Sequence, residues 1–583
     1  MTIAAVISRQ GGGLKYGLKC SRVDSVIRSR LSCLSFVSNN SLVSFYSTSS
    51  ASTSGFTSTS PSTSVIASSN TATTSALFSA SSRSTRSYRA RNIANSRNFT
   101  TTTSPKMPLT LDKLNAHVVD AKYAVRGRLA LRAEELRNQL KTNPKSLPFT
   151  EVINANIGNP QQLDQQPLTF FRQVLALVQY PQLIKHESCA KLFPRDVIER
   201  AMVLLKEIGS VGSYSHSKGV PYIRKSIAES IERRDGFPAD PESIYLTTGA
   251  SAGVERLLHI LSHSENSAFL IPIPQYPLYS ATLTLVNSNA VQYYLDESKD
   301  WGTDANKMRD IIEEAKREGL DLKAMVVINP GNPTGSVLTE QNIEEIIDIA
   351  AKDHIVIIAD EVYQTNVYKG EFISFKKVLR KMQQKDPQKY NHVELASLHS
   401  TSKGMVGECG QRGGYMELVG FHPDVEETIY KLASISLCPP VTGQVLTELM
   451  VNPPRAGDPS YEEYSQEFNS IYNTLKDRST ALYEAFKQME GVTCNPPEGA
   501  MYLFPRITIP DKAIEAANKA GYSMADEYYC TLLLEKTGIC VIPGSGFGQE
   551  PGTWHFRTTF LAPGTEYANR FVQFHKWFMD EYR

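Results

Sequence analysis

Residues 354–363 read His-Ile-Val-Ile-Ile-Ala-Asp-Glu-Val-Tyr, an almost continuous apolar run that ends in an acidic residue. A short run of this kind, rich in β-branched residues, predicts a strand at 355–360 that is buried on both faces. A carboxylate at the end of such a strand is costly to bury unless a cation pairs with it. Asp360 is therefore a candidate ligand-binding residue, with a cap on the following helix as the alternative reading.

Similar segments lie on both sides of this run and alternate with stretches of helical periodicity. The strand-like segments are 244–248, 268–272, 324–329 and 394–399, and the helical ones between them are 253–262, 306–318 and 340–352. This alternation predicts an α/β fold, with a mixed or mainly parallel sheet covered by helices on both faces. Ligands of such sheets bind beyond the carboxyl ends of the strands.

The flanking regions predict a smaller domain around this core. An amphipathic helix is expected at 118–140, ended by Asn143-Pro144, and long helices are expected at 458–489 and 524–536. Short strands are expected near 501–505 and 554–559. We therefore expect an N-terminal arm and part of a small domain at 106–210, a large domain at 211–440, and a C-terminal small α+β domain at 441–583.

Composition excludes several classes of protein. No apolar run approaches the roughly 18 residues of a membrane span. Residues 1–105 hold 11 Lys/Arg and one acid, Asp24, so the remaining 478 carry a net charge of −9. An acidic body argues against nucleic acid as a partner. The 8 cysteines form no CxxC pair, and we expect neither a disulfide framework nor a metal site.

The N-terminal 105 residues differ from the rest of the chain. Ser and Thr account for 42 of them, and Arg is the main charged residue. A segment that is rich in Arg and Ser and poor in acids is typical of a mitochondrial transit peptide, which predicts a location in the matrix. A disordered tail without a targeting role is the alternative. Composition turns globular at Met107, where a second start would produce a cytosolic form.

Three turns that follow predicted strands carry candidate binding residues. Leu246-Thr-Thr-Gly-Ala-Ser-Ala-Gly253 leads into a helix, whose free N–H groups can hold a phosphate, although tight packing alone would also explain it. In Pro272-Ile-Pro-Gln-Tyr-Pro277 the rigid Tyr276 could stack on a flat ring or plug a surface turn. Asn329-Pro-Gly-Asn-Pro-Thr-Gly335 fixes the backbone so that Asn332 can present its amide to a ligand.

A lysine in a hydroxyl- and glycine-rich segment follows the last of these strands. In His399-Ser-Thr-Ser-Lys-Gly404, Ser400 and Ser402 flank Lys403, and Arg412 follows nine residues later. An amine in this setting suits covalent chemistry with a carbonyl compound. A solvated surface lysine is the alternative, which the neighbouring residues disfavour.

Taken in order, these motifs resemble the class I and II aminotransferases, which are pyridoxal-phosphate enzymes of fold type I. The resemblance covers residues 110–583 and rests on Gly249-Ala-Ser-Ala-Gly253, Tyr276, Asn329–Gly335, Asp360-x-x-Tyr363, Ser400-x-Ser402-Lys403 and Arg412. The segments 399–415, 156–174 and 452–461 are similar to the branch of the family that uses alanine.

The resemblance implies roles in binding the cofactor, pyridoxal 5′-phosphate. Lys403 would hold its aldehyde and act as general acid and base, and Asp360 would keep its ring nitrogen protonated. Asn332 and Tyr363 would hydrogen-bond the phenolic oxygen of the ring, and Tyr276 would stack on its face. The residues implied at its phosphate are Ala250, Ser251, Ser400, Ser402 and Arg412.

The resemblance also implies a substrate site and a shared active site. Arg557 would bind the α-carboxylate of the substrate through its planar guanidinium, with Gly158 and Asn332 beside it. Tyr214, in Gly212-Ser-Tyr-Ser-His-Ser-Lys-Gly219, resembles a tyrosine that reaches the phosphate of the neighbouring subunit. The expected assembly is therefore a homodimer.

The implied reaction is a ping-pong transfer from L-alanine to 2-oxoglutarate, which yields pyruvate and L-glutamate. Alternatives within the family are an aminotransferase with an aromatic, kynurenine or 2-aminoadipate donor, and a lyase of the aminocyclopropane-carboxylate synthase type. A ligand-sensing regulator with a DNA-binding domain is a further alternative. The presence of Lys403 and the lack of a helix-turn-helix pattern in 1–105 argue against that one.

Overall fold

In a computed structural model, which describes residues 109–123, 127–564 and 566–583, the apolar run forms β6 (Val356–Asp360) at the centre of a seven-stranded sheet. The predicted transit peptide at 1–105 and the alternative start at Met107 lie outside the described residues. All five residues of β6 are buried, as expected for a central strand covered on both faces.

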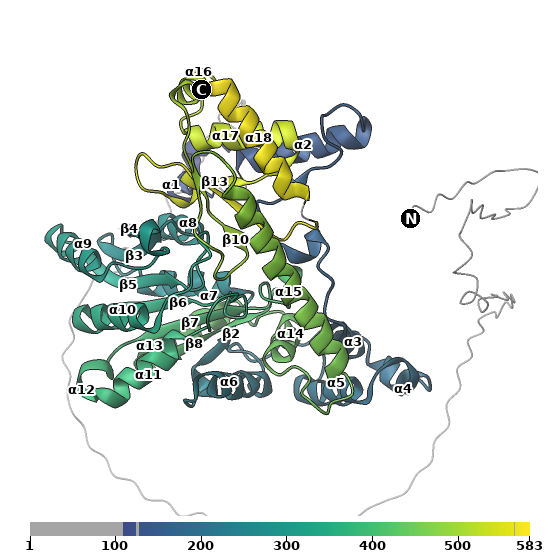
Figure 1. The fold of residues 1–583 in the computed structure, drawn as a ribbon. Coiled ribbons are helices and arrows are strands. Elements are labelled where there is room, and N and C mark those ends of the chain that lie inside the picture. Colours follow the sequence, from purple (N-terminus) through teal and green to yellow (C-terminus); the bar gives the residue numbers. More distant parts are fainter. Residues whose placement is uncertain (1–108, 124–126, 565) are drawn as a thin grey trace, which may run out of the picture. The chain divides into compact units, whose positions relative to one another are not determined.

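The sheet is mixed, in agreement with the prediction (Figure 1). Adjacent strands from β7 to β4 are parallel, whereas β8 runs antiparallel to both β2 and β7. In spatial order the strands are β2 (Ile244–Leu246), β8 (Gly414–Val419), β7 (Leu395–Ser400), β6, β5 (Asp321–Ile328), β3 (Ser267–Ile273) and β4 (Asn289–Tyr294). The strands β4 and β8 lie in stretches where no strand was predicted.

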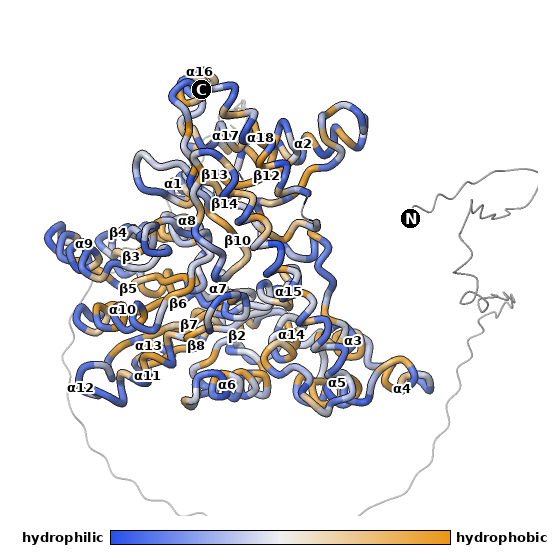
Figure 2. Tube along the Cα trace, viewed as in Figure 1, coloured by the Kyte–Doolittle hydropathy of each residue, from blue (hydrophilic) through white to orange (hydrophobic). Residues whose placement is uncertain are grey.

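Helices cover both faces of this sheet, also as predicted. One face packs against α9 (Ala305–Arg317), α10 (Glu340–Asp353) and α11 (Phe375–Lys385). The other packs against α7 (Ala250–Leu261), α8 (Leu278–Leu285) and α13 (Pro423–Ile435). Figure 2 shows β6 and β7 as hydrophobic, whereas the flanking helices carry hydrophilic residues as well. Burial of each Val, Leu or Ile side chain between these layers contributes roughly 1.5–3 kcal/mol to the stability of the fold.

A second set of elements joins the end of the chain to the segment before residue 160. Its core lies among α15 (Tyr461–Phe486), α17 (Ala525–Thr537), α18 (Glu566–Tyr582) and short strand pairs. The pairs comprise β1 (Ile153–Asn154) with β12 (Ile539–Cys540), β10 (Tyr502–Leu503) and β13 (Ile542–Pro543) with β14 (Phe556–Thr559), and β9 (Val492–Thr493) with β11 (Arg506–Ile507). The long helices and short strands predicted here are confirmed.

The remaining helices complete the fold around the sheet. The helix α14 (Val441–Val451) packs on α6 (Pro221–Asp235), α3 (Thr169–Gln179) and β8. Further helices are α4 (Cys189–Leu192), α5 (Arg195–Ile208), α12 (Pro387–Tyr390) and α16 (Asp511–Lys519). The predicted domain boundaries stay predictions. No helix in the described ranges is long and apolar enough to cross a membrane.

The single helix predicted at 118–140 is wrong. The chain instead forms α1 (Ala116–Asp120) and α2 (Arg128–Thr142), the second of which begins after Gly127. The two helices have different partners, since α1 packs on α8 and α2 packs on α17. Tertiary packing in two places thus overrides the continuous helical periodicity of the sequence. The expected end of the helix before Asn143-Pro144 is confirmed.

Candidate active site

The candidate motifs converge because they follow strands that run in one direction. The strands β3, β5, β6 and β7 are parallel, and β2 joins them with the same direction through β8. A cavity of about 350 Å³ lies beyond their carboxyl ends. Twelve of the thirteen predicted site residues line it, namely Gly158, Ala250, Ser251, Tyr276, Asn332, Asp360, Tyr363, Ser400, Ser402, Lys403, Arg412 and Arg557. The exception is Tyr214.

Lys403 points into this cavity from the loop that follows β7. Its Nζ atom donates a hydrogen bond of 3.1 Å to the carbonyl oxygen of Gly158. The ammonium also lies 5.7 Å from the ring centroid of Tyr363. The loop itself is fixed by Asn366, whose side-chain oxygen accepts a hydrogen bond from the Gly404 N–H at 2.9 Å. The amine is therefore held in place and borders open space.

Asp360 occupies the end of β6, on the floor of the cavity. Its carboxylate accepts hydrogen bonds from the Tyr279 hydroxyl at 2.8 Å and from the Val362 N–H at 3.4 Å. Burial raises the pKa of the Asp360 carboxyl, and the hydrogen bonds and the charge of Lys403 only partly oppose this. The side chain has no ion-pair partner among the described residues, so a cationic ligand atom would complete its environment.

A cradle suited to an anion forms where β2 leads into α7. Gly249 has φ of +72° at the start of this helix, and a Cβ atom on it would lie only 2.4 Å from the Arg412 guanidinium. Arg412 donates to the Ser251 hydroxyl at 3.3 Å and to the Thr248 carbonyl at 3.1 Å. The described residues provide no carboxylate partner for Arg412, so its charge is available to an anion at the N-terminus of α7.

Arg557 is the most deeply buried cation of the site, with 1% of its surface exposed. It donates to the side-chain oxygen of Asn332 at 2.9 Å and to the backbone carbonyl of Asn156. The guanidinium lies between the rings of Tyr502 and Phe547, at 4.1 and 4.6 Å from their centroids. Its buried Nε has no hydrogen-bond partner in the described structure. A buried guanidinium that no carboxylate of the described residues neutralises is suited to binding an anionic ligand.

Two tyrosines of the site were not found by sequence reasoning. Tyr279 hydrogen-bonds Asp360, and Tyr502 accepts a hydrogen bond of 3.1 Å from the Tyr363 hydroxyl. Burial opposes ionisation of Tyr502, but the charges of Lys403 and Arg557 outweigh it and lower the pKa of its hydroxyl. Tyr279 lies one turn after Tyr276 and could have been suspected, whereas nothing around Tyr502 points to a site.

Tyr276 is partly buried beside the cavity, whereas Tyr214 is mostly exposed. Burial raises the pKa of the Tyr276 hydroxyl, which lies 2.5 Å from the hydroxyl of Tyr123, a residue between α1 and α2. In contrast, 79% of the Tyr214 surface is exposed, and this residue does not line the cavity. A single chain therefore assembles every predicted site residue except the one that was predicted to act in a neighbouring subunit.

The sequence and fold of this chain are similar to those of known aminotransferases. A family model described as aminotransferase class I and II matches residues 178–572. The mitochondrial alanine aminotransferase of Saccharomyces cerevisiae is 54% identical over 486 residues, which cover 82% of each chain. A second relative from this yeast, named an inactive alanine aminotransferase, is 52% identical over 82% of this chain and 96% of its own. An alanine aminotransferase structure from Pyrococcus furiosus aligns with a TM-score of 0.63 at 26% identity, over 80% of this chain and 100% of that chain.

Proposed function

The chain belongs to the class I and II aminotransferases, whose cofactor is pyridoxal 5′-phosphate, and we propose that it transfers the amino group of L-alanine to 2-oxoglutarate. Relatives named alanine aminotransferase are 46–54% identical. Because a relative at 52% identity is named inactive, identity alone does not establish turnover. One observation carries the proposal: the cavity holds three basic side chains, Lys403, Arg412 and Arg557, that have no carboxylate partner in the described part of the chain.

Each of these three side chains has one group to bind in an aminotransferase complex. The groups are the cofactor phosphate for Arg412, the cofactor aldehyde for Lys403 and the substrate α-carboxylate for Arg557. Arg412 and the free N–H groups at Ala250 and Ser251 would hold the cofactor phosphate, with the hydroxyls of Ser400 and Ser402 lining the same side. The N-terminus of α7 adds a favourable dipole for this anion. A phosphate would thus satisfy charge and hydrogen bonding together.

The buried carboxylate of Asp360 could pair with the protonated ring nitrogen of the cofactor. A protonated ring nitrogen beside it would supply the cation that this carboxylate lacks, and Tyr279 orients the carboxylate from the other side. When bound, the cofactor supplies an electron-withdrawing ring that stabilises negative charge at the substrate Cα. Asn332 and Tyr363 border the cavity where they would bond the phenolic oxygen of the ring, and Tyr276 would cover its face.

Lys403 would attach the cofactor and then move the proton. Its Nζ, held by the Gly158 carbonyl, is placed to take the proton from the substrate Cα as a general base. Arg557 would bind the substrate α-carboxylate through two parallel N–H donors. Its contact with Asn332 keeps the guanidinium plane fixed, so the Cα–H bond is presented in one orientation.

The proposal includes a homodimer and a mitochondrial location. Tyr214 is exposed and would complete the phosphate site of the partner subunit. Relatives from Saccharomyces cerevisiae, Dictyostelium discoideum and Arabidopsis thaliana are named mitochondrial. The basic, Ser-rich residues 1–105 suit the same matrix address. A cytosolic form that starts at Met107 stays a prediction.

The visible absorption spectrum of the purified protein, supplied with cofactor, tests the proposal. We expect a yellow band that L-alanine bleaches and that 2-oxoglutarate then restores. Bleaching by L-kynurenine or an aromatic amino acid, without a response to L-alanine, would move the function to another donor within the family. Absence of the band would contradict the site assignment itself. Lys403→Ala serves as the control that should not form the band.

A further inference from the structure

We infer that Gln444 is a positioning residue, which fixes the loop that carries Tyr214 in the shape that a second copy of this chain can use. This inference rests on the proposed function, in which Tyr214 binds the cofactor phosphate of the partner subunit. The observation that carries it is a buried amide in α14 that bonds both ends of the loop at 215–220.

The hydrogen-bonding groups of Gln444 are directed at this loop. Its side-chain oxygen accepts the Val220 N–H at 3.0 Å, and its side-chain nitrogen donates to the Ser215 hydroxyl at 2.9 Å. The same nitrogen donates to the Pro439 carbonyl at 2.8 Å. With 1% of its surface exposed, Gln444 has no contact with bulk water to replace these bonds. Ser215 is the residue next to Tyr214, so the amide anchors the tyrosine at a distance of one residue.

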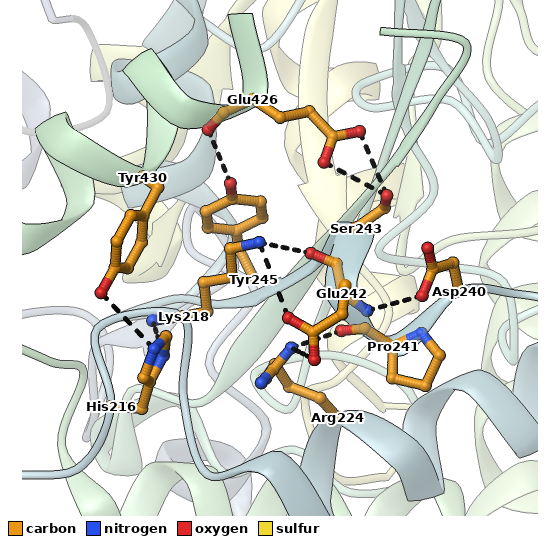
Figure 3. A network of polar contacts seen from close by, with 10 residues as sticks. All are labelled: His216, Lys218, Arg224, Asp240, Pro241, Glu242, Ser243, Tyr245, Glu426 and Tyr430. Carbon is orange, nitrogen blue, oxygen red and sulfur yellow. Dashed lines mark hydrogen bonds and ion pairs between the residues drawn. The ribbon is translucent and has the colours of Figure 1, made fainter. Parts of the chain in front are cut away.

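The second half of the loop is held separately, as Figure 3 shows. The His216 ring stacks on Tyr430, with centroids 5.4 Å apart, and its Nδ1 accepts the Lys218 N–H at 3.2 Å. The Lys218 ammonium lies 5.0 Å from the centroid of the Tyr245 ring and donates to the Glu242 carbonyl at 2.6 Å. These contacts do not involve Gln444, so its loss should loosen the two ends of the loop, at Ser215 and Val220, while His216 and Lys218 stay held. Tyr214 is next to the loosened Ser215.

The turn of α14 that holds Gln444 also packs against the phosphate-binding arginine of its own subunit. A Cβ atom on Gly413 would lie 2.4 Å from the Gly443 carbonyl, and one on Gly443 would lie 2.8 Å from the Arg412 carbonyl. One turn therefore supports Arg412 for the subunit's own phosphate site and Tyr214 for the site of the partner. Because the Gln444 side chain faces the loop, its effect on cofactor binding should be exerted on the partner.

Hybrid dimers separate an effect on the partner from a local one. In each hybrid the competent site is the one in the subunit that keeps Lys403, and it receives Tyr214 from the Lys403→Ala subunit. In the first hybrid one subunit carries both Lys403→Ala and Gln444→Met and the other is wild type, so the competent site receives Tyr214 from the altered loop. In the second, Lys403→Ala and Gln444→Met are in different subunits, so the competent site receives Tyr214 from an intact loop. The readout is the Kd for pyridoxal 5′-phosphate at the competent site.

We expect the Kd to rise about 10-fold in the first hybrid and to stay within about 2-fold of a Lys403→Ala/wild-type hybrid in the second. Equal values in the two hybrids, or the opposite order, would overturn the inference. Thr531→Val is the control, since its hydroxyl donates to the carbonyl of Glu527 within α17, away from both Arg412 and the Tyr214 loop. It should leave the Kd unchanged in either arrangement.

Two further variants keep the result interpretable. If the Gln444→Met protein does not fold as a dimer, Gln444→Glu replaces it, because glutamate retains the acceptor for the Val220 N–H. The Kd should again be higher in the first hybrid than in the second. The Tyr214→Phe homodimer tests the proposed function separately. If it binds cofactor with wild-type affinity, the shared phosphate site fails. If it binds weakly while the two hybrids are equal, only the role of Gln444 fails.

Discussion

The side-chain amine of Lys403 donates a hydrogen bond of 3.1 Å to the carbonyl oxygen of Gly158, which is 245 residues earlier in the chain. The contact joins the loop after β7 to the segment that follows β1. A second contact ties the same loop to α3, because Glu408 accepts two hydrogen bonds from Arg172 at 2.6 and 2.8 Å. The reactive amine is thus positioned by the packing of two distant segments.

Lys403→Ala should reduce kcat by on the order of 10³-fold or more, because both the covalent attachment and the general base are lost. Steady-state kinetics with L-alanine and 2-oxoglutarate would measure this. A reduction of only a few-fold would contradict the mechanism. Lys369→Ala, which removes a mostly exposed amine paired with Glu498, should leave kcat unchanged.

Gly158→Ala should lower kcat by about 100-fold while the protein remains folded. The new Cβ atom would lie 2.2 Å from the Tyr502 hydroxyl, so Tyr502 or the backbone at residue 158 must shift, and the carbonyl of that residue is the group that holds the Lys403 amine. Displacement of a reacting group by about 1 Å commonly costs this much. Gly410→Ala is the control in the Lys403 loop, since nothing lies within 4 Å of its added Cβ. Equal kcat values for the two variants would contradict the prediction.

Arg557→Lys should raise the apparent KM for L-alanine and for 2-oxoglutarate by roughly 10- to 100-fold, because a lysine cannot make two parallel hydrogen bonds to a carboxylate. Both substrates should be affected, since each carries an α-carboxylate. Arg506→Lys changes an exposed arginine of the nearby strand β11 and serves as the control. An unchanged KM for both substrates would refute the role of Arg557.

Glu361→Gln should stabilise the cofactor-free protein at neutral pH. Burial raises the pKa of Glu361 from 4.5 to about 7, although the Arg234 charge and the hydrogen bond from the Phe375 N–H oppose the shift. Between these two values the unfolded chain loses the proton while the folded chain keeps it, so the wild-type protein loses stability as pH rises. The stability advantage of the variant should grow by roughly 3 kcal/mol from pH 4.5 to 7 and then level off.

Urea unfolding of both proteins across this pH range would measure the difference. Glu344→Gln, at an exposed position of α10, is the control and should show no such trend. A constant difference between Glu361→Gln and the wild type at every pH would contradict the assigned titration.

Much of the fold could be predicted because its signals are local. The apolar run that forms β6 and the capped helix α10 show their periodicity within a few residues. The antiparallel strand β8 was not predicted, since it immediately follows the glycine-rich loop that ends near Arg412. The pair α1 and α2 was read as one helix, because its division depends on two separate packing partners.

By itself, the sequence determined which residues follow the strands and hence which ones form the site. Parallel strands bring their carboxyl ends to one edge, so Asn332, Asp360 and Lys403 had to meet once the strand order was set. Gly158 and Arg557 were implied only by the family resemblance, and the tertiary structure alone decided that they lie with Tyr502 around the same cavity. They come from short segments whose positions depend on long-range burial, and no local periodicity encodes such contacts. The same reason hid Gln444, whose partners Ser215 and Val220 are more than 200 residues away.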